Sequence, residues 1–112
     1  MSTFQHLATL DEVDSFVAEN TLAFLYISQP NCSVCHGLLP QVEQLLKKFP
    51  HIQTAHVQTN ELPSIAGHLS IFTVPVLLLF VEGKEYIREA RIVHLDQLEE
   101  KITFIYENFY TI

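Results

Sequence analysis

Two uninterrupted apolar segments constrain the fold of this chain more than any other feature. Residues 22–27 read LAFLYI and residues 75–81 read PVLLLFV, and each has the length of one strand. A strand with one face in water alternates apolar and polar residues, so continuous runs predict strands covered on both faces. Both runs are far shorter than the roughly 18 residues that a membrane-spanning helix needs. We therefore expect a sheet buried between two layers of helices.

The remaining patterns place helices between the strands. Thr9 and Glu12 form a capping-box pattern at the first helix, and a longer helix should begin at the cysteine pair and stop at Pro50. Gly83 lies in an expected hairpin turn. Further strands are predicted near 4–7, 52–58 and 85–92, and further helices over 61–69 and 95–105. The predicted fold class is α/β, with a central mixed β-sheet of four to five strands and helices on both faces.

Composition and charge limit the class of protein. The chain has 112 residues, 48% of them hydrophobic and 17% charged, which fits one domain over residues 1–112 and excludes a disordered chain. Its formal net charge is −7, so nucleic acid is not an expected partner. The N-terminal sequence has neither the basic region nor the continuous apolar stretch of an export signal. We expect a cytoplasmic protein without membrane association.

The only two cysteines lie in residues 30–36, which read PNCSVCH. Cys32 and Cys35 could carry out redox chemistry, form half of a zinc site, or attach a c-type haem together with His36. A haem would need both thiols as thioethers and is typical of exported helical proteins. A structural zinc ion needs four ligands, so zinc is an alternative only as a site that bridges two chains. We expect neither a metal nor a cofactor.

The predicted position of the two cysteines favours redox chemistry. They fall where a buried strand ends and a long helix begins, at the edge of the sheet where α/β proteins place their sites. The unpaired N–H groups of a helix start stabilise a thiolate. Cys32 should be the exposed sulfur, at or just before the first helical position, with Cys35 facing inward one turn along. In thiol–disulfide exchange one such sulfur attacks the substrate and the other resolves the mixed disulfide.

Pro40 and the pair Val74-Pro75 complete a set of motifs that resembles the thioredoxin family. The resemblance covers roughly residues 10–105: an apolar strand, C-x-x-C at a helix start, a proline inside that helix, a short helix, and Val-Pro opening a strand. It implies a thioredoxin-like fold and a cis peptide bond before Pro75, close to the cysteine pair. It also implies that backbone groups of Val74 bind an extended substrate segment.

The residues around the cysteines depart from the usual thioredoxin motif, Trp-Cys-Gly-Pro-Cys. Asn31, Ser33 and Val34 replace the tryptophan, the glycine and the proline of the active-site loop. The buried acid before the first cysteine is replaced by Tyr26, and its lysine partner aligns with His56.

Near the end of the last strand, Arg91 aligns with a glycine that leaves room for partners in the family. Together these departures favour a thioredoxin-like role over that of a general thioredoxin.

His56 has two possible roles. It could accept the proton that Cys35 must lose before resolution, since the unperturbed pKa of histidine lies near neutrality. It could instead be a structural partner of the Tyr26 hydroxyl, with Tyr26 simply part of the core. We favour the structural interpretation.

Two functions fit these observations. The first is a thiol–disulfide oxidoreductase that exchanges electrons between Cys32/Cys35 and protein or low-molecular-weight disulfides, with an unidentified reductant as second partner. The alternative is a binding module that docks partners at the Val74-Pro75 groove without essential redox turnover. We favour the enzyme, because a binding module has no physical need for both cysteines at the working spacing.

The C-terminal residues bear on oligomeric state, because four of them are aromatic. We expect these side chains to close over the core of a monomer. An exposed patch would instead favour a weak homodimer. The residues concerned are Phe104, Tyr106, Phe109 and Tyr110.

Overall fold

A computed structural model describes residues 4–110 of the chain. Strands and helices follow one another in the order that the sequence predicts. They are β1 (Gln5–Leu7), α1 (Leu10–Glu19), β2 (Leu22–Ser28), α2 (Ser33–Leu46), β3 (Gln53–Gln58), α3 (Ile65–Leu69), β4 (Val76–Val81), β5 (Lys84–Ala90) and α4 (Leu95–Tyr110). The predicted α/β fold class is confirmed.

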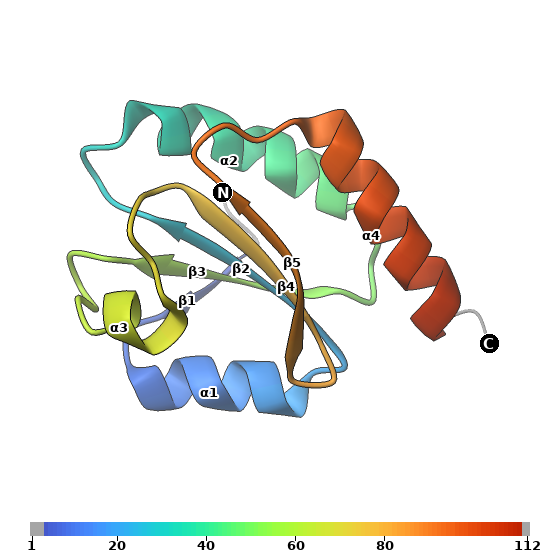
Figure 1. The fold of residues 1–112 in the computed structure, drawn as a ribbon, viewed down its shortest axis with the longest axis horizontal. Helices are drawn as coiled ribbons and strands as arrows, with labels where there is room; N and C mark the ends of the chain where they lie inside the picture. Colours follow the sequence, from blue (N-terminus) through green and yellow to red (C-terminus); the bar gives the residue numbers. More distant parts are fainter. Residues whose placement is uncertain (1–3, 111–112) are drawn as a thin grey trace.

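The sheet is mixed, and β2 lies at its centre (Figure 1). Its strand order is β1-β3-β2-β4-β5. The strands β1, β3 and β2 are parallel, whereas β4 pairs antiparallel with both β2 and β5. The carboxyl end of β2 therefore lies beside the start of β4, since Ile27 is the partner of Val76. This register brings the segment after β2 close to the segment before β4.

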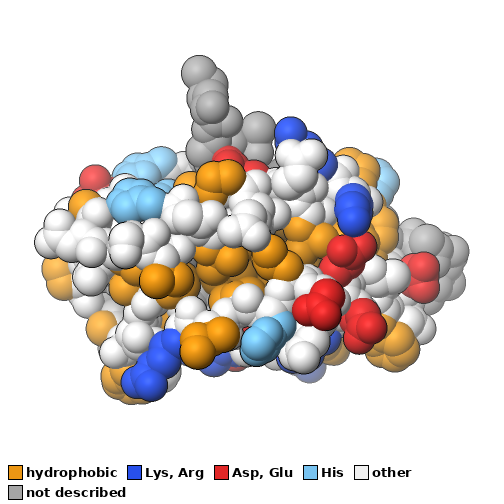
Figure 2. Space-filling view, turned by 90° about the horizontal axis from the view of Figure 1, so that it is seen from above, with side chains coloured by type: hydrophobic (Ala, Val, Ile, Leu, Met, Phe, Trp, Pro, Cys, Tyr) orange, Lys and Arg blue, Asp and Glu red, His pale blue; other side chains and the backbone are white. Residues whose placement is uncertain are grey.

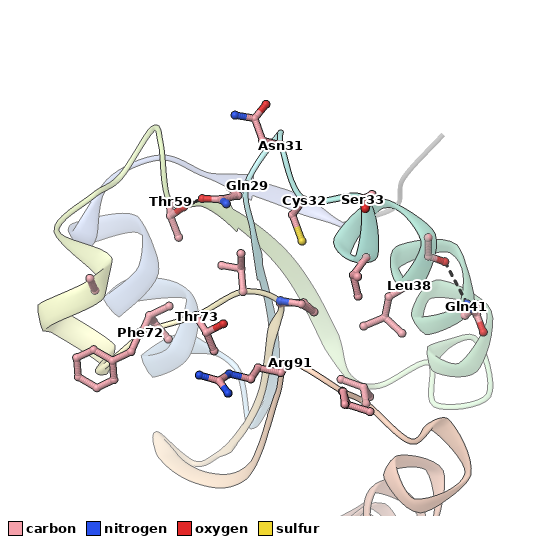
Figure 3. Close-up of a pocket in the computed structure, with 18 residues that line it drawn as sticks. Gln29, Asn31, Cys32, Ser33, Leu38, Gln41, Thr59, Phe72, Thr73 and Arg91 are labelled. Atoms are coloured by element: carbon pink, nitrogen blue, oxygen red, sulfur yellow. Dashed lines mark hydrogen bonds between the residues drawn. The ribbon is translucent and has the colours of Figure 1, made fainter.

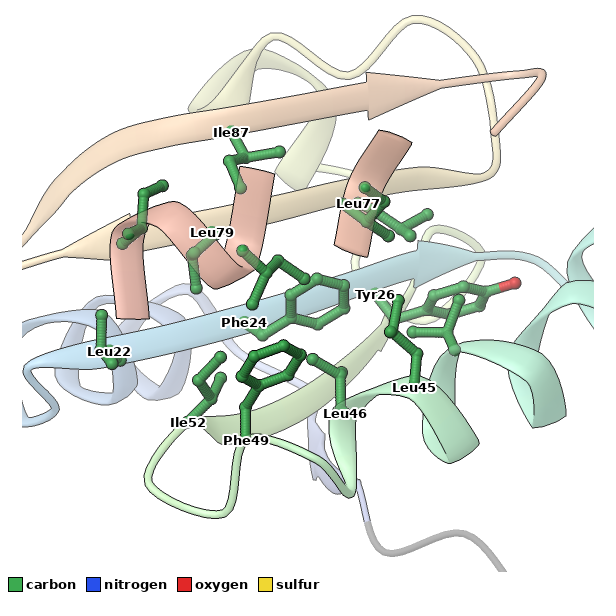
Figure 4. Packing of buried hydrophobic residues seen from close by; sticks show 14 of the residues in the cluster. Leu22, Phe24, Tyr26, Leu45, Leu46, Phe49, Ile52, Leu77, Leu79 and Ile87 are labelled. Atoms are coloured by element: carbon green, nitrogen blue, oxygen red, sulfur yellow. The ribbon is translucent and has the colours of Figure 1, made fainter. Parts of the chain in front are cut away.

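Helices cover both faces of the sheet, with α1 and α3 on one side and α2 and α4 on the other (Figure 1). Side chains of β2 alternate between the two resulting cores. Phe24 and Tyr26 pack with α2 and α4 (Figure 4), whereas Leu25 and Ile27 pack with α1 and α3. Every residue of β2 is buried. The uninterrupted apolar run in the sequence is explained by this double coverage.

The two edges of the sheet differ from its centre. The edge strand β1 has 3 residues. The edge strand β5 carries charged side chains, and Arg88 forms a salt bridge with Glu85 at 2.8 Å. The hydrogen bond from Arg88 lowers the pKa of Glu85. Arg88 also donates to the carbonyl oxygen of Leu69 at 2.8 Å, which ties β5 to the end of α3.

The predicted capping box and hairpin turn are both present. The Thr9 hydroxyl accepts a hydrogen bond from the Glu12 amide at 3.1 Å, and the Glu12 carboxylate accepts from the Thr9 amide at 3.0 Å. A further hydrogen bond from the Ala8 amide is the main cause of the lowered pKa of Glu12. In the turn, Glu82 and Gly83 have φ of 50° and 84°. Positive φ at both central residues is the geometry of a two-residue hairpin turn.

Several predicted boundaries are wrong, among them the end of the last helix, which runs to Tyr110 rather than to residue 105. The helix α2 ends at Leu46 rather than at Pro50, because i→i+3 hydrogen bonds from Lys48 and Phe49 tighten the chain after it. The helix predicted over 61–69 begins only at Ile65, since Pro63 disfavours helical geometry at the residue before it. The strand predicted over 85–92 ends at Ala90, because the next residue leaves the extended region.

The C-terminal aromatic residues only partly follow the prediction. Tyr106 packs on the core and on the ring of Phe49, with ring centroids 5.1 Å apart. Phe104, in contrast, points away from the core and is 69% exposed. It lies on the outward face of an amphipathic helix, so the expectation that it closes over the core is wrong. The side chain of Tyr110 lies outside the described residues. In the part of the chain that the structure describes, no helix has the length and apolar character to cross a membrane.

Candidate active site at the start of α2

Cys32 lies at the position that the sequence predicts, the N-cap of α2. Its backbone is extended, with φ −100° and ψ 100°, and its carbonyl oxygen accepts the first hydrogen bond of the helix from His36 at 3.2 Å. The Cys32 sulfur accepts a hydrogen bond from the Cys35 amide at 3.1 Å. An N–H donor of a helix start is thus aimed at this sulfur, where it would stabilise negative charge.

Cys35 lies one turn along α2 and faces the core. Its side chain is 2% exposed, whereas Cys32 is partly exposed, as predicted. The two residues form a disulfide with a Cα–Cα distance of 5.2 Å. The predicted disulfide reach is confirmed. In Figure 3 the sulfur of Cys32 points into a groove between the start of α2 and the segment before β4.

Tyr26 occupies the core beneath the cysteines, but its hydroxyl does not bind His56. It donates a hydrogen bond of 2.6 Å to the carbonyl oxygen of Cys35. The predicted Tyr26–His56 hydrogen bond is therefore wrong, although the two residues are register partners on neighbouring strands and their rings contact edge to face at 5.7 Å. Burial raises the pKa of Tyr26, so its hydroxyl stays protonated and acts as a donor.

His56 shares a hydrogen bond of 2.6 Å with the hydroxyl of Ser28, between Nε2 and Oγ. Ser28 is the last residue of β2 and is 5% exposed. Burial lowers the pKa of His56, with the nearby His6 as a second cause. The ring is therefore neutral at neutral pH.

The segment before β4 forms the opposite wall of the groove. The Val74–Pro75 peptide bond is cis, as the resemblance implies. The Pro75 carbonyl oxygen accepts a hydrogen bond from the Arg91 amide at 3.0 Å, which joins this segment to the end of β5. Among the described residues, no backbone hydrogen bond uses the amide or carbonyl of Val74. The groove thus presents unpaired backbone groups opposite the cysteine sulfur.

Apolar side chains surround the groove and are exposed to solvent. Phe72 is 90% exposed, Ile92 76% and Val34 60%. Figure 2 shows hydrophobic side chains gathered along the middle of the face seen from above, with acidic side chains gathered toward the right. Exposed apolar side chains beside a reactive group are typical of a binding surface.

Six of the eight predicted site residues line this groove: Asn31, Cys32, Ser33, Val34, Val74 and Pro75. Cys35 lies beneath it, and His56 lies on β3 behind the cysteine loop. The sequence did not single out Phe72 and Thr73, whose only signal was their position just before Val74-Pro75. Nor did it single out Ser28, the partner of His56, because a lone serine after an apolar run has no distinctive pattern.

The histidine next to the cysteines forms a hydrogen bond within the cysteine loop. His36 donates a hydrogen bond from Nε2 to the carbonyl oxygen of Pro30 at 2.7 Å. This bond closes the loop around Cys32. Among residues 4–110, no group of three or more His, Cys, Asp or Glu side chains is arranged to hold a metal ion.

A partly exposed sulfur at a helix N-cap, joined to a buried sulfur one turn behind it, defines a site for thiol–disulfide exchange. The comparisons with known proteins agree with this class. The family model for thioredoxin matches residues 5–104. The chain belongs to the thioredoxin family.

Several known proteins are similar to this chain. The Thioredoxin-like protein YdfQ of Bacillus subtilis (strain 168) is 43% identical over 106 residues, which cover 95% of each chain. Thioredoxin-1 of Saccharomyces cerevisiae is 29% identical over 77 residues, 69% of this chain and 75% of its own. The X-ray structure of Fasciola hepatica thioredoxin superposes with a TM-score of 0.81 at 26% identity, over 90% of this chain and 98% of that one.

These similarities and the Cys32–Cys35 disulfide identify the protein as a thiol–disulfide oxidoreductase. Membership of the family implies protein disulfides as substrates and a separate reductant. The alternative of a binding module without redox turnover is not favoured.

Proposed function

We propose that Cys32 is the attacking nucleophile and Cys35 the resolving thiol. The observation that carries this proposal is the difference in burial between two bonded sulfurs, one at the helix N-cap and open to the groove, the other 2% exposed behind it. A substrate disulfide can reach only the first sulfur. The N–H of Cys35 already points at the Cys32 sulfur, so a thiolate there would be stabilised.

The exchange then runs in two steps. The Cys32 thiolate attacks one sulfur of the substrate disulfide, a mixed disulfide forms, and the other substrate sulfur leaves as a thiolate and takes up a proton. Cys35 loses its proton and attacks the Cys32 sulfur, which forms the Cys32–Cys35 disulfide and releases the second substrate thiolate. The substrate gains two electrons and the cysteine pair loses two, which the reductant restores.

The backbone of Val74 and Pro75 is proposed to hold the substrate segment. The free amide and carbonyl of Val74 lie across the groove from Cys32 and could pair with an extended chain, as an added strand does. Asn31, Ser33 and Val34 form the opposite wall and would contact the residues beside the substrate cysteine. The exposed apolar rim would add contact area.

His56 is proposed to accept the Cys35 proton during resolution. Its ring is neutral, contacts Tyr26, and lies on the strand next to β2. The Tyr26 hydroxyl in turn donates a hydrogen bond to the backbone carbonyl oxygen of Cys35. A neutral imidazole can accept a proton, as the step requires, although burial makes His56 a weaker base than a free histidine.

We further propose that the protein acts in the cytoplasm as a monomer. A reducing compartment keeps the cysteine pair available for repeated reduction. The charged residues of the β5 edge support the monomer, since they oppose pairing with another strand.

Trapping experiments test the assignment of the two cysteines. Cys32→Ser should abolish reduction of a protein disulfide, whereas Cys35→Ser should accumulate a mixed disulfide that non-reducing electrophoresis and mass spectrometry detect. The matched control is a triple variant with Cys32→Ser, Cys35→Ser and Ser15→Cys, which carries one exposed thiol on α1, outside the groove. It should trap substrate far more slowly. If Cys32→Ser rather than Cys35→Ser accumulated the mixed disulfide, the roles of the two cysteines would be reversed.

A further inference from the structure

Arg91 has a backbone conformation that is unusual for a residue with a side chain. It directly follows β5 and has φ of 66°, in the left-handed region. This region suits glycine, because any Cβ there approaches the neighbouring carbonyl oxygen. Strain of this kind concentrates at functional sites, where a particular side chain is needed in spite of its cost. The residue in this strained position is an arginine, with a long and positively charged side chain.

The side chain of Arg91 lies in the groove. It lines the wall opposite Cys32, and Figure 3 shows it pointing toward the side of the groove on which Thr73 and Phe72 lie. Arg91 is exposed, and no salt bridge joins its guanidinium to another described residue. Arg88 provides the contrast, since Glu85 and two backbone carbonyls occupy its guanidinium. The donors of Arg91 thus remain available to a ligand.

The electrostatic setting makes this cation distinctive. Of the described residues that line the groove, Arg91 alone carries a formal charge. The chain as a whole has a net charge of −7, which repels anionic substrates. A single guanidinium in the same groove as the reactive sulfur would offset this repulsion locally. It would also offer two parallel N–H donors to a carboxylate.

We infer that Arg91 is a specificity-determining residue that selects disulfide substrates with an aspartate or glutamate close to the attacked cysteine. The inference rests on the proposed function of the groove and adds to it a class of substrate. The substrate backbone would lie along Val74, and its carboxylate would bind the guanidinium on the same wall. Neutral segments would still bind through the backbone and the apolar rim, with lower reactivity.

Matched peptides test this inference. Each peptide has one cysteine as a 2-pyridyl disulfide, a neutral leaving group whose release is followed by absorbance. Asp or Asn occupies each of the three positions on either side of the cysteine in turn. The reduced protein should react faster with Asp than with Asn at one or two positions, by roughly 2- to 5-fold, the range of a partly exposed ion pair. Added salt should reduce this ratio.

Variants at position 91 test whether the ratio of the Asp and Asn peptide rates depends on Arg91. Arg91→Gln should bring the Asp/Asn ratio close to one, Arg91→Lys should keep part of it, and Arg91→Glu should invert it. Arg91→Gly should also lose the ratio, and its backbone accepts the left-handed φ, so a folding defect cannot account for the loss. The control is Lys84→Gln, which removes the same charge from an exposed residue at the far end of β5. It should leave the ratio unchanged.

Two results would overturn the inference. Equal rates for Asp and Asn peptides at all six positions would do so while leaving the proposed function intact, as would a ratio that survives in both Arg91→Gln and Arg91→Gly. If no peptide of either kind released its leaving group, the proposed function would fail, and the inference with it.

Discussion

The Tyr26 hydroxyl donates a 2.6 Å hydrogen bond to the carbonyl oxygen of Cys35, inside the core. It joins the central strand β2 to the first turn of α2, although the cysteine loop separates the two elements in sequence. The position of the cysteine pair relative to the sheet therefore depends on a neutral tyrosine rather than on a buried acid.

Removal of this hydroxyl should destabilise the oxidised protein. Tyr26→Phe keeps the ring and loses one buried hydrogen bond, so we expect the free energy of unfolding to fall by about 1 kcal/mol. Urea denaturation measures the change. Tyr86→Phe, at a tyrosine that is 51% exposed, is the matched control and should change stability by no more than a few tenths of a kcal/mol. Equal stability of the two variants would show that the Tyr26 bond contributes nothing.

His56→Ala should slow resolution while it leaves attack by Cys32 nearly unchanged. Attack uses a thiolate stabilised at the helix N-cap, whereas resolution needs the buried Cys35 to lose a proton. We expect a loss of roughly 10- to 100-fold in the second step, shrinking as pH rises and Cys35 ionises unaided. Single-turnover kinetics on a mixed disulfide, at several pH values, separate the two steps.

His68→Ala serves as the control for this kinetic experiment. His68 also has a side-chain partner, Asp14 at 2.6 Å, but it lies on α3 on the other face of the sheet. Its removal should leave both steps unchanged. An unchanged resolution rate in His56→Ala would return His56 to a structural role.

The lowered pKa of His56 predicts how stability depends on pH. Burial disfavours the charged ring in the folded state, so the unfolded chain binds this proton more readily. The folded state should therefore lose stability as pH falls below the ordinary histidine value of 6.5, and regain it as pH rises through that window. Chemical denaturation at several pH values should show a shallower acid loss for His56→Gln than for the wild type. If the free energy of unfolding fell equally with pH in His56→Gln and in the wild type, the prediction would be contradicted.

The left-handed backbone of Arg91 should cost stability. Replacement by glycine relieves the strain, and replacement by alanine does not, so Arg91→Gly should be more stable than Arg91→Ala by about 1 kcal/mol. The reciprocal test is Gly83→Ala, where φ is 84° and the change should destabilise by a similar amount. Thermal unfolding measures both. If alanine equals glycine at position 91, strain does not limit this position.

The sequence predicted the framework well because its strongest signals are physical constraints on whole elements. The apolar runs become β2 and β4, and the capping box and hairpin turn lie where their residues require. The cysteine pair could be placed because a strand end and a helix start fix its surroundings. The sequence also predicted that Tyr26 and His56 lie close together, and the two are register partners on neighbouring strands.

What the sequence did not predict depends on contacts between distant side chains. The hydroxyl of Tyr26 had several possible acceptors, and its choice of Cys35 follows from how closely α2 approaches the sheet. Ser28 became a partner of His56 only through the pairing of β2 with β3. The left-handed turn at Arg91 has no local signal, because arginine does not favour it.

The two edges of the sheet have a consequence for the protein at high concentration. Addition of a strand from another copy at β5 would partly shield Lys84, Glu85, Arg88 and Glu89 from water, and β1 offers only a short template. Removal of such charges from water is costly unless the incoming strand neutralises them. Open-ended growth into cross-β fibres is therefore disfavoured at both edges, and we expect concentrated solutions to remain free of thioflavin-binding aggregates.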